Sequence, residues 1–289
     1  MSNRWRERRI IAFAHQGGSY EGPSSTLAAI ESALASGATA IELDVHATAD
    51  RHIVVCHDET VDRTTNHHGA IAELTLAELR EMDNAYWWIA GSDVTPGAPD
   101  EQYLHRGRGP TDRAFAVATL EDVVERFPGV LLNLDLKRAA PDVEPYESLL
   151  ADELRRLDRT ASVIVASFHD RAIEVFRAHA PDVATSAATN ETAAFYFASL
   201  EGRAPTIEGA VALQVPVRFG HVTVVDERFV EAARAADLAL HVWTVNDAGE
   251  MEQLVDLGVD GVISDRPSVL ATILERRGAA WDGVLEAAG

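Results

Sequence analysis

Short apolar runs alternate along the chain with longer stretches in which apolar residues recur at helical spacing. Eight of the short runs are rich in β-branched or aliphatic residues and lack regular polar alternation, which is typical of strands buried on both faces of a parallel sheet. The pattern therefore predicts an α/β fold. The predicted strands are Ile10–Phe13, Ala40–Val45, Val130–Leu136, Ala161–Ala166, Val183–Ser186, Gly209–Val215, Leu238–Val242 and Gly261–Ile263.

Between these strands, apolar residues recur every three or four positions, which is the spacing of an amphipathic helix. The first such stretch carries Leu27, Ile30 and Leu34. Ser24 or Ser25 is expected to be its N-cap, and Gly37 is expected to end it. A capping box at Thr119–Asp122 predicts the start of another helix, and further helices are predicted at Val143–Leu157, Arg171–His179, Glu227–Ala236, Asp247–Leu257 and Pro267–Arg277.

Strands and helices that alternate over this length could close into a (β/α)₈ barrel or remain an open, doubly wound sheet. The spacing alone does not choose between the two architectures. No Gly-rich dinucleotide or P-loop fingerprint follows any predicted strand, which disfavours the nucleotide-binding open sheets.

One stretch, from about residue 58 to residue 115, breaks the alternation. It holds a short helix pattern at Leu74–Met82, the aromatic cluster Tyr86-Trp87-Trp88, and a span rich in Gly, Pro and Asp at residues 91–110. We interpret it as an insertion after the second strand region, partly loop, of the kind that often covers a site. Residues 1–289 as a whole are expected to form one domain. The aromatic cluster is expected either to contact a ligand or to staple the loop.

The charge balance excludes several classes of partner. The 289 residues include 25 Lys and Arg against 46 Asp and Glu, and the net charge of −21 would repel nucleic acid and anionic lipid. No apolar run approaches the roughly 18 residues that a membrane span requires, and the apolar stretch after the basic N-terminus is too short for a signal peptide. Cys56 is the single cysteine, which excludes an intrachain disulfide and favours a cytoplasmic location.

Polar side chains follow or end several of the predicted strands. Glu42 and Asp44 have the i, i+2 spacing that places both side chains on one face of a strand. Carboxylates in an apolar run are costly unless they are paired or bound to a cation, and their oxygens suit Mg²⁺ or Ca²⁺. Asp135 offers a third carboxylate in a similar strand, and Lys137 lies on the same face.

Each of these residues alone has an ordinary explanation, because strand carboxylates are usually salt-bridged and single histidines usually belong to the core or surface. The combination is rarer. The chain reads His-x₂₆-Glu-x-Asp-x₁₂-His from His15 to His57, with every member at a strand end. The carboxyl ends of parallel barrel strands gather around one mouth, where catalytic residues are placed.

This constellation resembles the glycerophosphodiester phosphodiesterase family. That family's pattern is a strand ending in His-Arg-Gly, a Pro-Glu-Asn-Thr turn, a strand ending in Glu-x-Asp, and a strand leading to His-Asp. The resemblance spans roughly residues 10 to 275. The matching segments are His15-Gln16-Gly17, Pro23-Ser24-Ser25-Thr26, Glu42-Leu43-Asp44, His57-Asp58, Asn133–Lys137, Ser167-Phe168, Val242–Asn246 and Gly258–Pro267.

The resemblance implies a (β/α)₈ TIM barrel that hydrolyses a small-molecule phosphodiester to an alcohol and a phosphomonoester with the help of one divalent cation, Ca²⁺ or Mg²⁺. Histidine suits the proton transfers because it titrates near neutrality, and a cation would offset phosphoryl charge. The implied roles are metal binding for Glu42, Asp44 and Asp135, general base or nucleophile and general acid for His15 and His57, and substrate binding for Gln16, Lys137 and Trp243.

The chain departs from the family pattern at three places. Gln16 replaces an arginine, Ser24-Ser25 replaces Glu-Asn, and the third carboxylate is the shorter Asp135 where many members have Glu. Because Gln16 loses a charged phosphate contact, we expect a less anionic or larger diester, and we expect Gln16→Arg to raise activity on small anionic diesters. The alternatives are a lysophospholipase D-like enzyme, a cyclising phospholipase D-like transferase, and a barrel that binds a phosphorylated metabolite with weak turnover.

Overall fold

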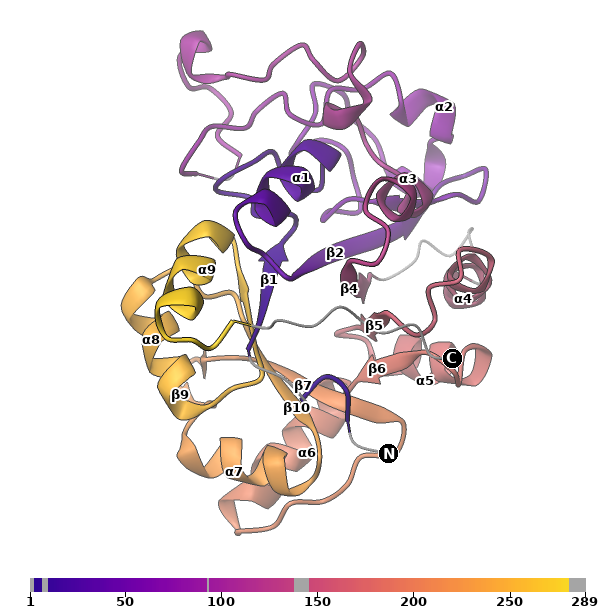
Figure 1. The fold of residues 1–289 in the computed structure, drawn as a ribbon. Helices are drawn as coiled ribbons and strands as arrows, with labels where there is room; N and C mark the ends of the chain where they lie inside the picture. Colours follow the sequence, from indigo (N-terminus) through magenta and orange to yellow (C-terminus); the bar gives the residue numbers. More distant parts are fainter. Residues whose placement is uncertain (1–2, 7–9, 93, 138–145, 281–289) are drawn as a thin grey trace.

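The computed structural model of the chain describes residues 3–6, 10–92, 94–137 and 146–280. Eight parallel strands form a sheet that closes on itself, because β1 pairs with both β2 and β11 (Figure 1). The predicted (β/α)₈ barrel is therefore confirmed, and each predicted strand overlaps an observed one. The barrel strands are β1 (Ile11–His15), β2 (Ala40–Ala47), β4 (Leu131–Leu136), β5 (Val163–Ala166), β6 (Ala184–Ser186), β7 (Ala210–Pro216), β10 (Ala239–Trp243) and β11 (Gly261–Ser264).

Helices form an outer layer around the barrel (Figure 1). They are α1 (Leu27–Ala35), α3 (Leu120–Arg126), α4 (Tyr146–Arg156), α5 (Asp170–His179), α6 (Thr189–Leu200), α7 (Glu227–Ala235), α8 (Ala248–Leu257) and α9 (Pro267–Arg276). The capping box at Thr119 is present, and Gly37 follows the last turn of α1 with a φ of 100°. Residues 143–145 of the predicted helix at 143–157 lie outside the described residues.

Two details of the helices differ from the prediction. The N-cap of α1 is Thr26, whose side chain accepts a hydrogen bond from the Ala29 N–H, and neither Ser24 nor Ser25. Helix α6 was not predicted, because its apolar side chains do not keep to one face: Phe195 is buried while Phe197 and Leu200 are exposed. Without a single apolar stripe, the periodicity that marks a surface helix is absent.

The stretch between β2 and α3 contains only short elements among its described residues. They are β3 (Ile53–Val55), which runs antiparallel to β2, the 3₁₀ turns η1 (Ile71–Glu73), η2 (Asp100–Gln102) and η3 (Arg113–Phe115), and the one-turn helix α2 (Leu76–Leu79). The aromatic cluster ties this stretch together, because Trp87 Nε1 donates to Thr65 O and Trp88 Nε1 donates to Ser19 O, both at 2.7 Å. This fits the stapling alternative.

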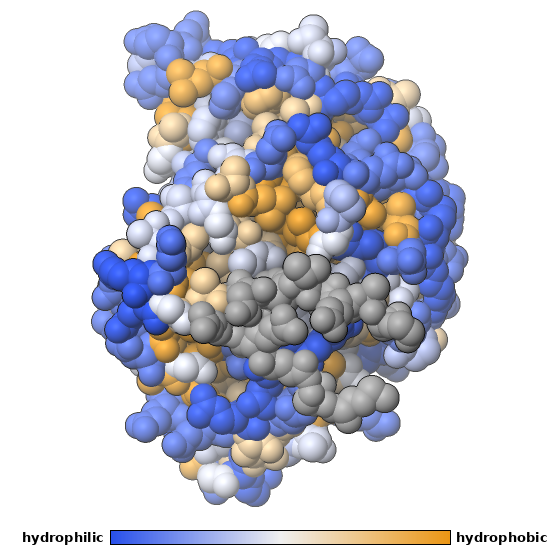
Figure 2. Space-filling model, viewed as in Figure 1, coloured by the Kyte–Doolittle hydropathy of each residue, from blue (hydrophilic) through white to orange (hydrophobic). Residues whose placement is uncertain are grey.

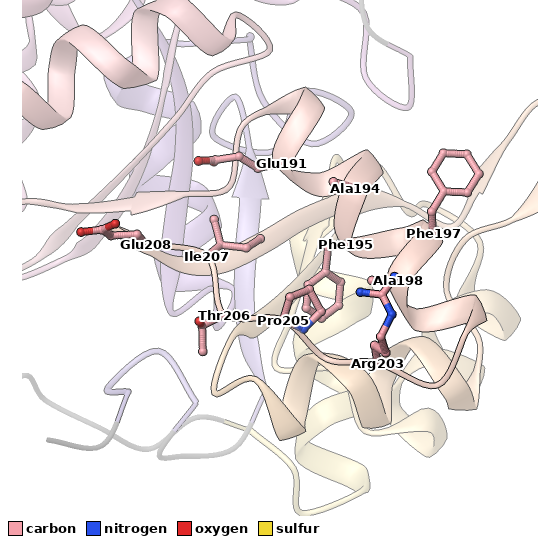
Figure 3. A pocket seen from close by; sticks show the side chains of 10 residues that line it. All are labelled: Glu191, Ala194, Phe195, Phe197, Ala198, Arg203, Pro205, Thr206, Ile207 and Glu208. Carbon is pink, nitrogen blue, oxygen red and sulfur yellow. The ribbon is translucent and has the colours of Figure 1, made fainter.

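A shallow hollow of about 510 Å³ lies on the outside of the barrel, between α6 and residues 203–208 (Figure 3). Its lining is mainly apolar, and it includes none of the predicted site residues. The face drawn in Figure 2 is largely hydrophilic, in keeping with the net charge of −21. Among the described helices, none has the length and apolar character needed to cross a bilayer.

The barrel interior is filled by side chains rather than open. Phe13 and Ile263 pack with Trp5, which lies at the start of the strands and is itself 4% exposed. Above them, His241 is completely buried, and its Nδ1 accepts a hydrogen bond from Gln214 Nε2 at 3.3 Å. Gly261 makes this packing possible, because a Cβ there would lie 2.8 Å from the Phe13 ring and 2.9 Å from the His241 ring.

Gly261→Ala is expected to destabilise the protein by about 1–3 kcal/mol, the usual cost of overpacking a core, as measured by urea unfolding. The matched control is Gly249→Ala in the first turn of α8, where the nearest atom to the added Cβ is the Asp247 side chain at 3.2 Å and helix propensity favours Ala. Equal stabilities for the two variants would contradict the packing argument.

Burial lowers the pKa of His241 to about 3, whereas an unfolded histidine titrates near 6.5. Between these values the unfolded state binds a proton that the folded state does not. Stability is therefore full above about pH 6.5 and falls as the pH drops, by at most about 1.4 kcal/mol per pH unit from this group. We expect His241→Phe to flatten the slope of unfolding free energy between pH 6.5 and 5, and an unchanged slope would contradict this origin.

Candidate active site

Three neighbouring strands bring the predicted residues to one mouth of the barrel. The strand register sets His15 of β1 opposite Glu42 of β2, and Asp44 of β2 opposite Asp135 of β4. Lys137 follows β4 directly. These positions are at the carboxyl ends of the strands, where (β/α)₈ barrels carry their active sites. The structure therefore places these five predicted residues side by side.

Lys137 is the positive centre of this group. Its Nζ lies 2.8 Å from Asp44 Oδ1 and 2.6 Å from Asp135 Oδ2. Burial opposes the charged form of Lys137, but the fields of Asp44 and Asp135 outweigh burial and raise its pKa. The second oxygens, Asp44 Oδ2 and Asp135 Oδ1, are buried and have no hydrogen-bond partner among the residues that the structure describes.

Glu42 shows that this cluster carries excess negative charge. Burial, followed by repulsion from Asp44, raises the pKa of Glu42 to about 8. Burial also raises the pKa of Asp135. Lys137 is the counter-charge at two of the three buried carboxylates, and the ionised forms of Glu42 and Asp135 remain disfavoured unless more positive charge is supplied.

The chemistry of these donors fits a hard divalent cation. Carboxylate oxygens are the ligands that Ca²⁺ and Mg²⁺ prefer, and the unpartnered oxygens of Asp44 and Asp135 are available for such a role. In the described part of the chain, however, no three His, Cys, Asp or Glu side chains are already placed to hold a metal ion. The side chains instead adopt the arrangement in which Lys137 bridges the two aspartates.

His15 is held by a carboxylate from the last strand. Its Nδ1 lies 2.6 Å from Asp265 Oδ1, and its Nε2 lies 3.8 Å from Glu42 Oε2. Asp265 is itself fixed by Ser19 Oγ at 2.7 Å and Asn246 Nδ2 at 2.6 Å. Burial alone would lower the pKa of His15, but attraction to Glu42 and then to Asp265 outweighs it and raises the pKa to about 9.

His57 is held in the same way by the residue that follows it. It follows β3, and its Nδ1 lies 2.6 Å from Asp58 Oδ1 while Arg63 Nε donates to Asp58 Oδ2 at 2.7 Å. Burial opposes ionisation of Asp58, but the His57 hydrogen bond and Arg63 prevail and lower its pKa to about 2. The charged form of His57 lowers the pKa of Asp135, whereas His15 lies beside Glu42. The two histidines therefore interact with different members of the row of carboxylates.

An apolar wall stands beside Lys137. The side chain of Trp243, at the end of β10, packs edge-on against Phe168 with 5.4 Å between ring centroids, and Lys137 Nζ lies 5.9 Å from the Phe168 ring centre. Phe168 is 57% exposed. The structure thus connects the predicted substrate residue Trp243 to the site through Phe168.

Sequence reasoning assigned no role to three of these residues. Asp265 and Asp58 orient the two histidines, and Phe168 links Trp243 to Lys137. Asp58 directly follows His57, and Asp265 comes two residues after a predicted strand, so a search for carboxylates at strand ends would have found both. No local signal pairs Asp265 with a histidine 250 positions earlier.

The family model described as "Glycerophosphoryl diester phosphodiesterase family" matches residues 15–269. The chain belongs to this family. The match begins at His15 itself and extends past Asp265, so it includes every residue of the site described above.

Individual relatives and solved structures are similar to this chain over nearly all of their length. The glycerophosphodiester phosphodiesterase of Caldanaerobacter subterraneus is 28% identical, over 93% of this chain and 100% of the relative. The glycerophosphoryl diester phosphodiesterase domain of a Mycobacterium tuberculosis protein has a TM-score of 0.73 at 19% identity, with 93% and 100% of the two chains covered. A phosphodiesterase from Oleispira antarctica, solved in complex with the product sn-glycerol-3-phosphate, has a TM-score of 0.69 at 23% identity, with 92% and 97% covered.

Asp265→Asn is expected to lower kcat on a glycerophosphodiester by at least about 100-fold, because an amide no longer holds the Nδ1 proton of His15, as seen for triad aspartates. The control is Asp226→Asn at the N-cap of α7, a position where Asn and Asp are equivalent. Circular dichroism would verify folding. Full activity in Asp265→Asn would contradict the orienting role.

Proposed function

We propose that this site hydrolyses glycerophosphodiesters to an alcohol and a phosphomonoester. The observation that carries the proposal is a buried row of three carboxylates with one lysine, flanked by two histidines that each have Nδ1 held by an aspartate. Family membership supports the same reaction class, and a relative of the same fold has been solved with sn-glycerol-3-phosphate as its product.

The family is generally dependent on a divalent metal. We propose that one Ca²⁺ or Mg²⁺ is held by Glu42, Asp44 and Asp135, where it would offset the developing charge on the phosphoryl oxygens. The net charge of the chain is −21, so the protein as a whole repels anions. The cation would therefore also attract the anionic substrate to the site.

The two histidines supply the proton transfers. With Nδ1 engaged by Asp265 or Asp58, each ring has Nε2 left for chemistry. One histidine assists attack on phosphorus, as general base or nucleophile, and the other protonates the oxygen of the leaving alcohol. The paired aspartates stabilise each imidazolium as it forms and keep the ring oriented, as in other carboxylate–histidine pairs.

Lys137 and Gln16 are the proposed contacts to the phosphate, and the wall of Phe168 and Trp243 receives the alcohol. An exposed phenylalanine beside Trp243 suits a leaving group with apolar surface. This observation favours, as a second candidate, a lysophospholipase D-like activity on a diester that carries an acyl chain. We further propose a single-domain cytoplasmic enzyme, in keeping with the single buried cysteine.

The test is to remove bound metal with a chelator and to assay glycerophosphocholine and lysophosphatidylcholine with Ca²⁺ or Mg²⁺ added back. We expect chelation to abolish activity and one of the cations to restore it. His15→Ala and His57→Ala should each lower kcat by at least about 100-fold, within the range that acid–base catalysis supplies.

His169→Ala is the matched control, because His169 precedes α5 and belongs to neither pair. It should keep wild-type kcat. The absence of metal-restored hydrolysis of any diester would exclude the proposed function, and product analysis would separate hydrolysis from cyclisation.

A further inference from the structure

Two of the places where this chain departs from the family pattern are in direct contact. Gln16 stands where the pattern has arginine, and Ser24 stands where it has glutamate. The Ser24 hydroxyl donates to Gln16 Oε1 at 2.5 Å, and the backbone N–H of Ser25 donates to Gln16 O at 2.8 Å. Both side chains are buried, with Gln16 4% and Ser24 2% exposed. The two substitutions therefore occupy one shared space inside the site.

The contact fixes the orientation of the Gln16 amide. Because Oε1 accepts from Ser24, the amide NH₂ faces the other way, and Gln16 Nε2 lies 3.3 Å from His15 Nε2. The Gln16 amide therefore lies beside Nε2 of the His15 ring, while Nδ1 faces Asp265 at 2.6 Å. Gln16 and Asp265 thus contact the two ring nitrogens of His15 and hold the ring between them.

The backbone of Gln16 restricts the side chain further. Gln16 has a φ of 51°, and its N–H donates to Glu42 Oε2 at 3.2 Å. The backbone hydrogen bond fixes the Gln16 main chain beside Glu42. The hydrogen bond from Ser24 then prevents the side-chain amide from rotating.

We propose that Ser24 and Gln16 are positioning residues that act as one neutral pair, hold the Nε2 side of the His15 ring in place, and replace the pattern's Arg and Glu jointly. This inference rests on the proposed function for its kinetic consequence, but the hydrogen-bond chain does not depend on it. Ser24 acts through Gln16, since in the described part of the chain its side chain hydrogen-bonds with Gln16 and Ser25.

Donor and acceptor chemistry explains why the two positions depend on each other. An arginine at position 16 could only donate to the Ser24 hydroxyl, and its buried charge would face a neutral partner. A glutamate at position 24 would bury a carboxylate against the Gln16 oxygen. With both changes made together, the guanidinium and the carboxylate satisfy each other. The expected benefit of Gln16→Arg therefore requires Ser24→Glu as well.

The first test is kinetic, on the metal-loaded protein with glycerophosphocholine. Ser24→Ala should lower kcat by about 10-fold with KM unchanged, within the range seen when a supporting hydrogen bond is lost. Ser24→Thr keeps the hydroxyl and should restore most of the loss. The matched control is Ser199→Ala on α6, which removes the hydroxyl of an equally buried serine away from the site.

The second test is a double-mutant cycle with Gln16→Arg and Ser24→Glu. Each single change should lower kcat/KM by at least about tenfold, and the combined loss should be at least about tenfold smaller than the product of the single losses, as for other contacting pairs. Independent, multiplicative losses would overturn the joint replacement.

The third test follows the His15 ring directly by ¹⁵N NMR of histidine-labelled protein, with the His15 signals assigned through His15→Gln. Ser24→Ala should shift the His15 Nε2 signal, whereas Ser199→Ala should leave it unchanged. If the wild type hydrolyses no diester, the proposed function fails while this arm still tests the pair. If the wild type is active and Ser24→Ala keeps both kcat and the His15 Nε2 signal, the inference alone is overturned.

Discussion

The burial of three carboxylates around a single lysine is the constraint on which the rest of the site depends. Burial and repulsion from Asp44 raise the pKa of Glu42, and one oxygen each of Asp44 and Asp135 lacks a hydrogen-bond partner among the described residues. Such a cluster is unstable without compensating charge. Lys137 supplies part of it, the flanking histidines can supply more, and a divalent cation is the remaining chemical solution. The same imbalance that threatens stability attracts a cation, and the bound cation would in turn attract a phosphodiester to an otherwise anionic protein.

The closed sheet is what makes this arrangement precise in space. Residues from β1, β2 and β4 meet because the register aligns them, not because they are close in sequence. Beneath them, Phe13, Ile263 and His241 fill the interior, and Gly261 leaves room for two rings. Polar groups at the mouth thus stand on a packed core, and rigid strands hold them better than mobile loops could.

The parts of the fold and site that could be predicted are those marked by short-range patterns in the sequence. Strands buried on both faces show as uninterrupted apolar runs, so the barrel strands could be located, and the carboxylates and histidines stood out at their ends. Helix α6 could not be found because Phe197 and Leu200 are exposed and blur its periodicity. The pairing of Asp265 with His15 and the contact of Ser24 with Gln16 arise from chain closure and side-chain packing. No spacing rule encodes them, so two departures that looked separate in the sequence proved to be neighbours.

The placement of Trp5 has a consequence for the path of reactants. Asn3 Nδ2 binds Val211 O at 2.7 Å and Asp237 O at 2.8 Å, which anchors this segment across the start of β7 and β10, and Trp5 seals the barrel floor. Among the described residues, the carboxylates are therefore closed off on the floor side, and a substrate would reach them from the mouth at the strand ends. On the proposed assignment the alcohol would lie at the rim by Phe168 and the phosphomonoester deeper, so both products would leave through the mouth by which the diester entered.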